Sequence, residues 1–183
     1  VASRGLGDVY KRQVYEISFD CELPADALLG EEGQGFKTAM KVLDRGRIEV
    51  AAMSIGISRK AMEHAVAWSK TRHINGKPIA ALQAIAFKLA DIYARYQQAF
   101  LVTMDAAHSR DTGEDFTIKS ATAKLVASEA AAFITDEALQ IHGGYGFTRD
   151  FPLERYARDV RIFRIYEGSS EIQRTIIGRQ LTR

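Results

Sequence analysis

The stretch FKTAMKVLDRGRIEVAAMSIGISRKAMEHAVAWSKTR, residues 36–72, decides the fold class of this chain. Its apolar side chains recur three and four positions apart, from Phe36 and Met40 to Trp68, which is the spacing of one face of an α-helix. No proline interrupts the run. A helix of this length, about 55 Å at 1.5 Å per residue, needs tertiary packing to be stable, so we expect several helical partners.

Further helical patterns follow on the C-terminal side. The segment Asn-Gly-Lys-Pro at 75–78 is a predicted turn that ends the first helix. The second pattern covers 82–111, with an apolar stripe from Leu82 to Met104 that is compatible with an oligomer contact. The third pattern covers 117–142 and ends at two glycines. Its expected inward positions are Ile118, Thr122, Leu125, Val126, Phe133, Ile134, Ala138 and Ile141.

Two shorter helices complete the pattern. Pro152 is suited to the first position of a helix that ends near Arg161. A last helix is predicted to begin near Ser170, because Ser170 and Gln173 have the spacing of a capping box. Helices of this length with short connections predict an all-α protein, an antiparallel four-helix bundle.

The N-terminal region does not follow the helical pattern. Residues 1–13 are predicted to be a non-native or disordered leader, because 8–13 can be encoded by a sequence resembling the transposon end used to build sequencing libraries. Residues 14–19 alternate between apolar and polar and predict a strand. Residues 20–34 contain proline and glycine and predict a loop. The bundle is expected over 36–183.

Composition excludes several classes of protein. Lys plus Arg total 25 and Asp plus Glu total 23, a balance that argues against nucleic-acid binding and against a polybasic membrane anchor. The lone Cys21 cannot form an internal disulfide or build a zinc site, so no metal is expected. No apolar run reaches the about 18 residues of a membrane span. We therefore expect a soluble, reduced, intracellular protein.

Two segments of the helical region carry polar groups that can have either a structural role or a binding role. Asp44 and Arg47 share one face of the long helix, and a surface ion pair explains that spacing as well as a binding role does. Arg72 lies at the end of the same helix, where an arginine commonly satisfies free carbonyls. Spacing alone favours the structural reading of both.

Two later segments are more unusual. Residues 140–147, QIHGGYGF, have three glycines in four positions, which lets a bulky group approach the backbone. A dinucleotide phosphate loop is excluded, because a helix and not a strand precedes them. Taken alone, His142 is better explained as a packed or capping residue than as a catalytic one. In 166–173, YEGSSEIQ, Glu167 stands just before a helix N-terminus, where a desolvated carboxylate can serve as a general base or simply favour the helix dipole.

Four motifs, in this order and spacing, resemble the C-terminal part of the acyl-CoA dehydrogenases. They are LPADALLGEEGQGF at 23–36, RHINGKPIAALQ at 72–83, QIHGGYGFTRDF at 140–151 and RIYEGSSEIQ at 164–173. The resemblance covers 14–183. It implies that 36–183 is the family's C-terminal helical bundle, and that 14–35 is the last strand and loop of its middle β-domain.

The resemblance also implies roles for single residues. Glu167 matches the catalytic base, which removes the α-proton of an acyl-CoA thioester while hydride passes from the β-carbon to FAD. Gly46 stands where enzymes of the isovaleryl type carry their base instead. The substrate-binding positions are Asp44, Arg47, Tyr166 and Gly168. The FAD-binding positions are Arg72, Gln83, Gln140, Ile141, His142, Gly143, Gly144, Ser169, Ser170 and Glu171, of which 140–144 match the segment that wraps the FAD of a neighbouring subunit.

These matches imply a flavoprotein oxidoreductase, an acyl-CoA dehydrogenase of fatty-acid β-oxidation. Its electron acceptor would be electron-transferring flavoprotein, and it would be a homotetramer or dimer with shared FAD sites, in bacterial cytoplasm or the mitochondrial matrix. The fragment alone is expected to be inactive, because the domain that covers the flavin is not part of this chain. Two alternatives stay open: an acyl-CoA oxidase-like flavoenzyme, distinguished by its reaction with oxygen, and a non-catalytic helical interaction module.

Overall fold

The computed structural model of the 183-residue chain describes residues 5–7 and 13–182. Its contacts divide the chain into two units, with the division between Phe36 and Lys37. Of the predicted leader, residues 1–4 and 8–12 lie outside the described part of the chain. None of the described helices is both long enough and apolar enough to cross a membrane.

Among its described residues, the first unit contains one small antiparallel sheet. Strand β1 (Gly5–Gly7) pairs with β2 (Gln13–Tyr15), with Leu6 opposite Val14. The predicted strand over 14–19 is therefore too long, since β2 ends at Tyr15, where its three-residue partner offers no further hydrogen-bonding groups. The predicted loop that follows is irregular except for one short 3₁₀ turn, Ala25–Ala27.

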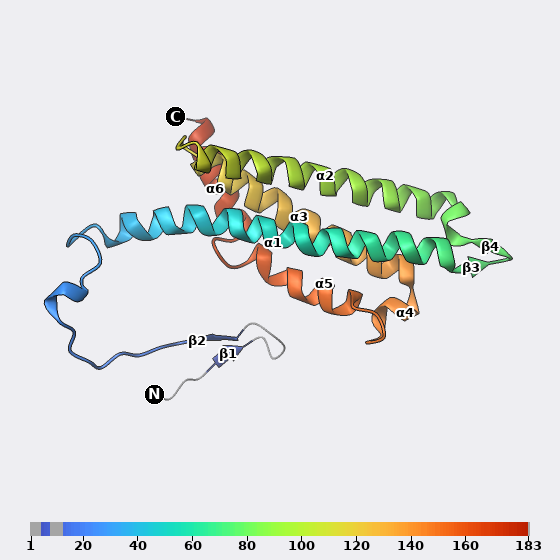
Figure 1. Ribbon diagram of the computed structural model, residues 1–183, viewed down its shortest axis with the longest axis horizontal. Helices are drawn as coiled ribbons and strands as arrows, with labels where there is room; N and C mark the ends of the chain where they lie inside the picture. The colour runs from blue at the N-terminus through green and yellow to red at the C-terminus, as the bar shows by residue number, and fades with distance from the viewer. Residues whose placement is uncertain (1–4, 8–12, 183) are drawn as a thin grey trace. The chain divides into compact units, whose positions relative to one another are not determined.

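The second unit is the helical bundle, and the all-α prediction is confirmed. Figure 1 shows α1, α2, α3 and α5 in alternating chain direction. The helices are α1 (Gly35–Thr71), α2 (Gln83–Asp111), α3 (Thr117–His142), α4 (Gly144–Phe147), α5 (Leu153–Arg161) and α6 (Ser170–Leu181). The short helix α4 is the one that the sequence pattern did not predict. Because it is a single turn after Gly143, no apolar period could reveal it.

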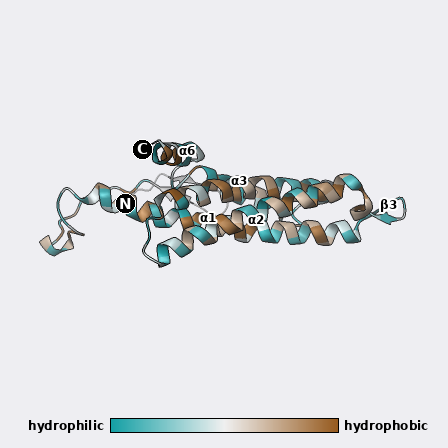
Figure 2. Ribbon diagram, turned by 90° about the horizontal axis from the view of Figure 1, so that it is seen from above, coloured by the Kyte–Doolittle hydropathy of each residue, from teal (hydrophilic) through white to brown (hydrophobic). Residues whose placement is uncertain are grey.

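Helix α3 is the centre of the bundle, with contacts to α2, α4, α5 and α6. Its buried positions are largely small: Ala121, Ala123, Ala127, Ala130, Ala131 and Ala138. Short side chains let neighbouring helices approach α3 from several sides. Of the predicted inward positions, Ile134, Ala138 and Ile141 are buried, and the other five are half-buried. Figure 2 shows apolar residues recurring along α2 and α3.

Helix α2 lies at the edge of the bundle, where its main helical partner is α3. Of its predicted apolar stripe, Ile92 is fully buried and joins the core. Other members of the stripe remain exposed: Leu82, Tyr93, Phe100 and Met104. The described residues of this chain therefore leave part of the apolar face of α2 uncovered.

The predicted turn between α1 and α2 is a tight hairpin. Strands β3 (His73–Ile74) and β4 (Lys77–Pro78) pair across Asn75 and Gly76. These two residues have φ values of 51° and 77°, and positive φ at both central residues is what a two-residue type I′ turn requires. The hairpin sets Arg72 at the end of α1 close to the start of α2.

Candidate active site

Glu167 lies in a strained turn between the 3₁₀ helix Ile162–Arg164 and α6. Its φ is 54°, and the φ of Gly168 is 84°. Glycine adopts this left-handed conformation freely, but for glutamate it costs about 1–3 kcal/mol and persists only where the surroundings enforce it. Strain of this kind is common at functional positions, which makes the turn a candidate site.

Two buried side chains enforce the turn through its carbonyl groups. Gln173 Nε2 donates to the carbonyl oxygens of Glu167, at 3.1 Å, and of Gly168, at 2.9 Å. Lys124 Nζ, from the middle of α3, donates to the carbonyl oxygen of Gly168 at 2.6 Å. A side chain at Gly168 is also unfavourable, because the φ of 84° is left-handed and a Cβ would lie 2.7 Å from Gln173 Nε2, which would have to move away from the turn.

The predicted capping box at the start of α6 is wrong. The N-cap is Ser169, whose hydroxyl oxygen accepts the N–H of Ile172 at 3.4 Å. Ser170 instead donates its hydroxyl to Glu129 on α3 at 2.7 Å. Gln173 turns back to the carbonyls of the turn, so both partners of the expected box are used for tertiary contacts.

The carboxylate of Glu167 lies against the backbone of α1 at Gly46. A methyl group at Gly46 would lie 2.7 Å from Glu167 Oε2 and 3.2 Å from the carboxyl carbon. Real Cβ contacts do not come that close, so the carboxylate occupies the space that any side chain at position 46 would need. Positions 46 and 167 therefore reach the same point in the molecule, although they lie far apart in the sequence.

Asp44 and Arg47 form an ion pair beneath this point. The reading of this pair as a surface contact is wrong, because Arg47 is only 5% exposed. Burial raises the pKa of the Asp44 carboxyl, while Arg47 opposes the rise and Asp115 adds to it. Among the residues that the structure describes, Arg47 Nε is one of the few buried polar atoms without a hydrogen-bond partner.

A second group of predicted residues gathers at the other end of α1. The rings of Trp68 and His142 stack with centroids 5.0 Å apart, and the Arg72 guanidinium lies 5.5 Å from the centre of the Tyr145 ring. Ile141 and His142 are buried, so their side chains face the bundle. The exposed members of the predicted FAD set at this end are Arg72, Gln83, Gln140, Gly143 and Gly144.

The two groups are well separated along α3. Lys124 of α3 bonds the turn that contains Glu167, and His142 at the end of α3 belongs to the aromatic group with Trp68. They lie about five helical turns apart, or about 27 Å at 1.5 Å per residue. The structure thus brings Asp44, Arg47, Tyr166, Gly168 and Ser169–Glu171 to the region of Glu167, and the remaining predicted residues to a distinct region.

Residues 33–182 match the family model described as "Acyl-CoA dehydrogenase, C-terminal domain". The match extends over most of the chain. The chain belongs to the acyl-CoA dehydrogenase family. The resemblance inferred from the four motifs is thereby confirmed. The mitochondrial short-chain specific acyl-CoA dehydrogenase of Rattus norvegicus is 49% identical over 164 residues, which are 90% of this chain and 40% of that protein.

Solved structures show the same fold at similar coverage. The butyryl-CoA dehydrogenase of Megasphaera elsdenii superposes with a TM-score of 0.88 at 44% identity, over 93% of this chain and 44% of that one. A chain from a structure described as the electron transferring flavoprotein of Acidaminococcus fermentans gives a TM-score of 0.88 at 42% identity, over 93% and 44%. This acyl-CoA dehydrogenase chain therefore spans less than half the length of these relatives.

Two residues of the site, Lys124 and Glu129, had no role predicted from the sequence, and the predicted capping role of Gln173 was not the one it has in the structure. A signal for the first was present, because Lys124 interrupts an otherwise small and apolar run in the third helical pattern. A lysine within such a run is seldom fully buried without a specific partner. The partner itself, a carbonyl more than forty residues later, follows only from the tertiary structure.

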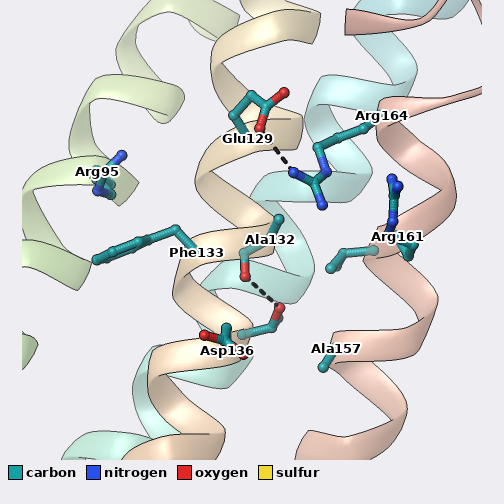
Figure 3. A pocket seen from close by; sticks show the side chains of 10 residues that line it. Arg95, Glu129, Ala132, Phe133, Asp136, Ala157, Arg161 and Arg164 are labelled. Atoms are coloured by element: carbon teal, nitrogen blue, oxygen red, sulfur yellow. Dashed lines mark hydrogen bonds and ion pairs between the residues drawn. The ribbon is translucent and has the colours of Figure 1, made fainter.

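A cavity of about 460 Å³ opens between α2, α3 and α5 (Figure 3). Its lining includes Glu129, which accepts the hydroxyl of Ser170. Figure 3 shows Glu129 paired with Arg164, at 3.2 Å, and Arg95 beside Phe133, with 4.0 Å from its guanidinium carbon to the ring centre. None of the residues that match the family's catalytic or FAD positions lines it. Among the described residues, no group of three His, Cys, Asp or Glu could hold a metal ion.

His142 makes the stability of this domain depend on pH. Burial lowers the pKa of its imidazole, the hydrogen bond to the Ala138 carbonyl opposes this, and His64 adds to it. The unfolded chain therefore takes up this proton first as the pH falls below about 6.5, and the free energy of unfolding decreases. We expect urea-induced unfolding to show this loss between about pH 7.5 and pH 5.5. His142→Phe flattens the dependence, whereas substitution of the exposed His108 by Asn leaves it in place; equal slopes for both variants contradict the assignment.

Proposed function

We propose that this chain is the C-terminal part of an FAD-dependent acyl-CoA dehydrogenase and that Glu167 is its catalytic base. One observation carries the proposal: the Glu167 carboxylate sits on a strained turn, enforced by buried donors and pressed against a glycine of the long helix. A general base needs a fixed position within hydrogen-bond reach of the proton it removes. The family membership supplies the substrate class, an acyl-CoA thioester.

In this proposal Glu167 accepts the proton from the α-carbon of the thioester on one carboxylate oxygen. The charge that develops on the thioester oxygen needs hydrogen-bond donors, and the backbone N–H of Glu167 is one candidate. The chemistry that FAD would supply, when bound, is acceptance of the hydride from the β-carbon. Asp44, Arg47, Tyr166 and Gly168 would line the substrate side, and the buried Arg47 would add positive charge beside the base.

The residues present fit a flavin dinucleotide. Arg72 offers an exposed cation to a pyrophosphate. Gly143, with φ 61°, and Gly144 leave their surroundings open, because a Cβ built at either would meet nothing within 4 Å. Ser170 already donates its hydroxyl to Glu129, so a contact from it would use its backbone amide. The separation of the two groups supports binding to different FAD molecules, one of which belongs to a neighbouring subunit.

The same proposal includes an oligomer and an electron acceptor. The uncovered apolar face of α2 supports a homotetramer or dimer, because large exposed apolar patches commonly mark subunit contacts. The similarity to a chain described with an electron transferring flavoprotein supports that protein as the acceptor. We place the enzyme in fatty-acid β-oxidation, in bacterial cytoplasm or in the mitochondrial matrix.

The substrate is proposed to be a short acyl chain, because a short-chain specific acyl-CoA dehydrogenase at 49% identity and a butyryl-CoA dehydrogenase at 44% identity are among the relatives. We expect the full-length enzyme to reduce a dye acceptor fastest with butyryl-CoA, ahead of octanoyl- and palmitoyl-CoA. A preference for palmitoyl-CoA would contradict the proposed acyl chain length but not the proposed function. A flavin-loaded enzyme without turnover on any of the three contradicts the function, and hydrogen peroxide formed at the same rate as product identifies an oxidase.

A further inference from the structure

Lys124 is a buried cation that the proposed chemistry does not use. It is 0% exposed, in the middle of α3, among small and apolar neighbours. An ammonium group in such a place loses its hydration and needs specific compensation. Its Nζ has that compensation at one point, the carbonyl oxygen of Gly168 at 2.6 Å.

The charges that act on Lys124 come from α1, from α3 itself, from the Glu167 turn and from α6. Arg47 of α1 repels it, and Glu129 of α3, Glu167 of the turn and Glu171 of α6 attract it. Burial is the largest influence, and together they lower the pKa of Lys124 to about 8. The Lys124 ammonium is therefore attracted by the Glu167 carboxylate, although its hydrogen bond goes to the carbonyl of the next residue, Gly168.

The hydrogen bond from Lys124 to the Gly168 carbonyl stabilises a turn that, unlike a helix or strand, has an unfavourable backbone conformation. Two successive residues in the left-handed region form a peptide orientation that glutamate does not favour. The Gly168 carbonyl accepts from both Lys124 and Gln173, so donors from α3 and α6 meet on one oxygen. Gln173 also donates to the Glu167 carbonyl. The two donors therefore fix the peptides on both sides of Gly168, and through them the backbone from which the Glu167 side chain approaches Gly46.

We propose that Lys124, together with Gln173, is a positioning residue of the active site: the two donors clamp the Glu167–Gly168 turn so that the base carboxylate lies against Gly46. This inference rests on the proposed function for its kinetic consequence, but its geometric consequence is independent of it. The role assigned to Lys124 is indirect, because its buried ammonium donates to the backbone carbonyl of Gly168.

The variants are chosen to separate positioning from stability in the full-length enzyme. Lys124→Met keeps the length of the side chain and removes the donor, and Lys124→Arg retains a donor. Gln173→Met removes the second donor from the opposite helix. The matched control is Thr135→Val, which removes a buried hydroxyl of α3 that bonds only within its own helix, to Ala131 and Ala132.

For Lys124→Met and Gln173→Met we expect kcat per bound flavin to fall about 100-fold, the usual effect of a base displaced by about 1 Å. KM for the acyl-CoA and the flavin content remain within about threefold, and Lys124→Arg recovers at least about tenfold. Thr135→Val keeps wild-type kcat.

An unchanged kcat per flavin in Lys124→Met, with only a lower melting temperature, overturns the proposal, since a structural lysine predicts that result. If Lys124→Met does not fold, Gln173→Met decides by the same criterion. A crystal structure of either variant gives a readout without chemistry: the Glu167 carboxylate should leave Gly46, and a carboxylate still in contact with Gly46 refutes the clamp. An active Glu167→Gln enzyme would instead refute the proposed function and leave this geometric test in force.

Discussion

Glu167→Gln in the full-length enzyme is expected to lower kcat by about 10⁴-fold, the upper range for loss of a positioned general base. The amide has nearly the same shape as the carboxylate, so the left-handed turn and its bonds from Lys124 and Gln173 remain. What is lost is the ability to accept a proton. The measurement is dye reduction by butyryl-CoA, per mole of bound flavin.

The control for this variant is Glu63→Gln. Glu63 lies on the exposed side of α1 and pairs with Arg59 and Lys60, away from the turn. It is expected to keep wild-type turnover and flavin content. Turnover of Glu167→Gln within about tenfold of wild type contradicts the role of Glu167 as the base.

Moving the carboxylate from position 167 to position 46 is expected to restore part of the lost activity. The contact of 2.7 Å between Glu167 Oε2 and a Cβ at Gly46 means that a glutamate at 46 can reach the same region from α1. Glu167→Gly alone removes the base and also relieves the positive φ at 167. The double variant Glu167→Gly, Gly46→Glu is expected to exceed this single variant by at least about 100-fold in kcat, within the usual gain from a general base.

Gly46→Glu is expected to lower activity, not raise it, when Glu167 is still present. Its side chain would collide with Glu167 and bring a second negative charge to the same space, so we expect low activity. The matched control is Gly46→Gln with Glu167→Gly, which has the shape of the relocated side chain and cannot accept the proton. If this control is as active as the variant with the relocated glutamate, the recovery comes from packing. That result would contradict the claim that a carboxylate at position 46 can replace the one at position 167.

The sequence pattern predicted the long helices well, for reasons visible in single residues. The bounds of α3 were predicted correctly because two glycines follow its last residue, His142, and a polar segment that contains a glycine, 111–115, lies just before its start. At the start of α6 the local signal misled. Ser169 and Ser170 both suit an N-cap, and the contact of Ser170 with Glu129, a residue on another helix, decides between them.

The candidate site was predictable only through the resemblance. Asp44 and Arg47 have the spacing of an ordinary surface pair, and their burial follows from the packing of α1 on the rest of the bundle. Nothing in the spacing brings Gly46 to Glu167. The roles of the FAD-binding positions stay predictions, although the exposure of Arg72 and the open backbone at Gly143 and Gly144 are compatible with them.

The most direct measurement is a crystal structure of the full-length Glu167→Gln enzyme with FAD and butyryl-CoA bound. The side-chain amide of residue 167 is expected about 3–3.5 Å from the α-carbon of the thioester, the separation of a near-attack arrangement. The side chain is also expected to remain in contact with Gly46. A residue 167 turned to solvent, with another carboxylate beside the α-carbon, would contradict the assignment of Glu167 as the base.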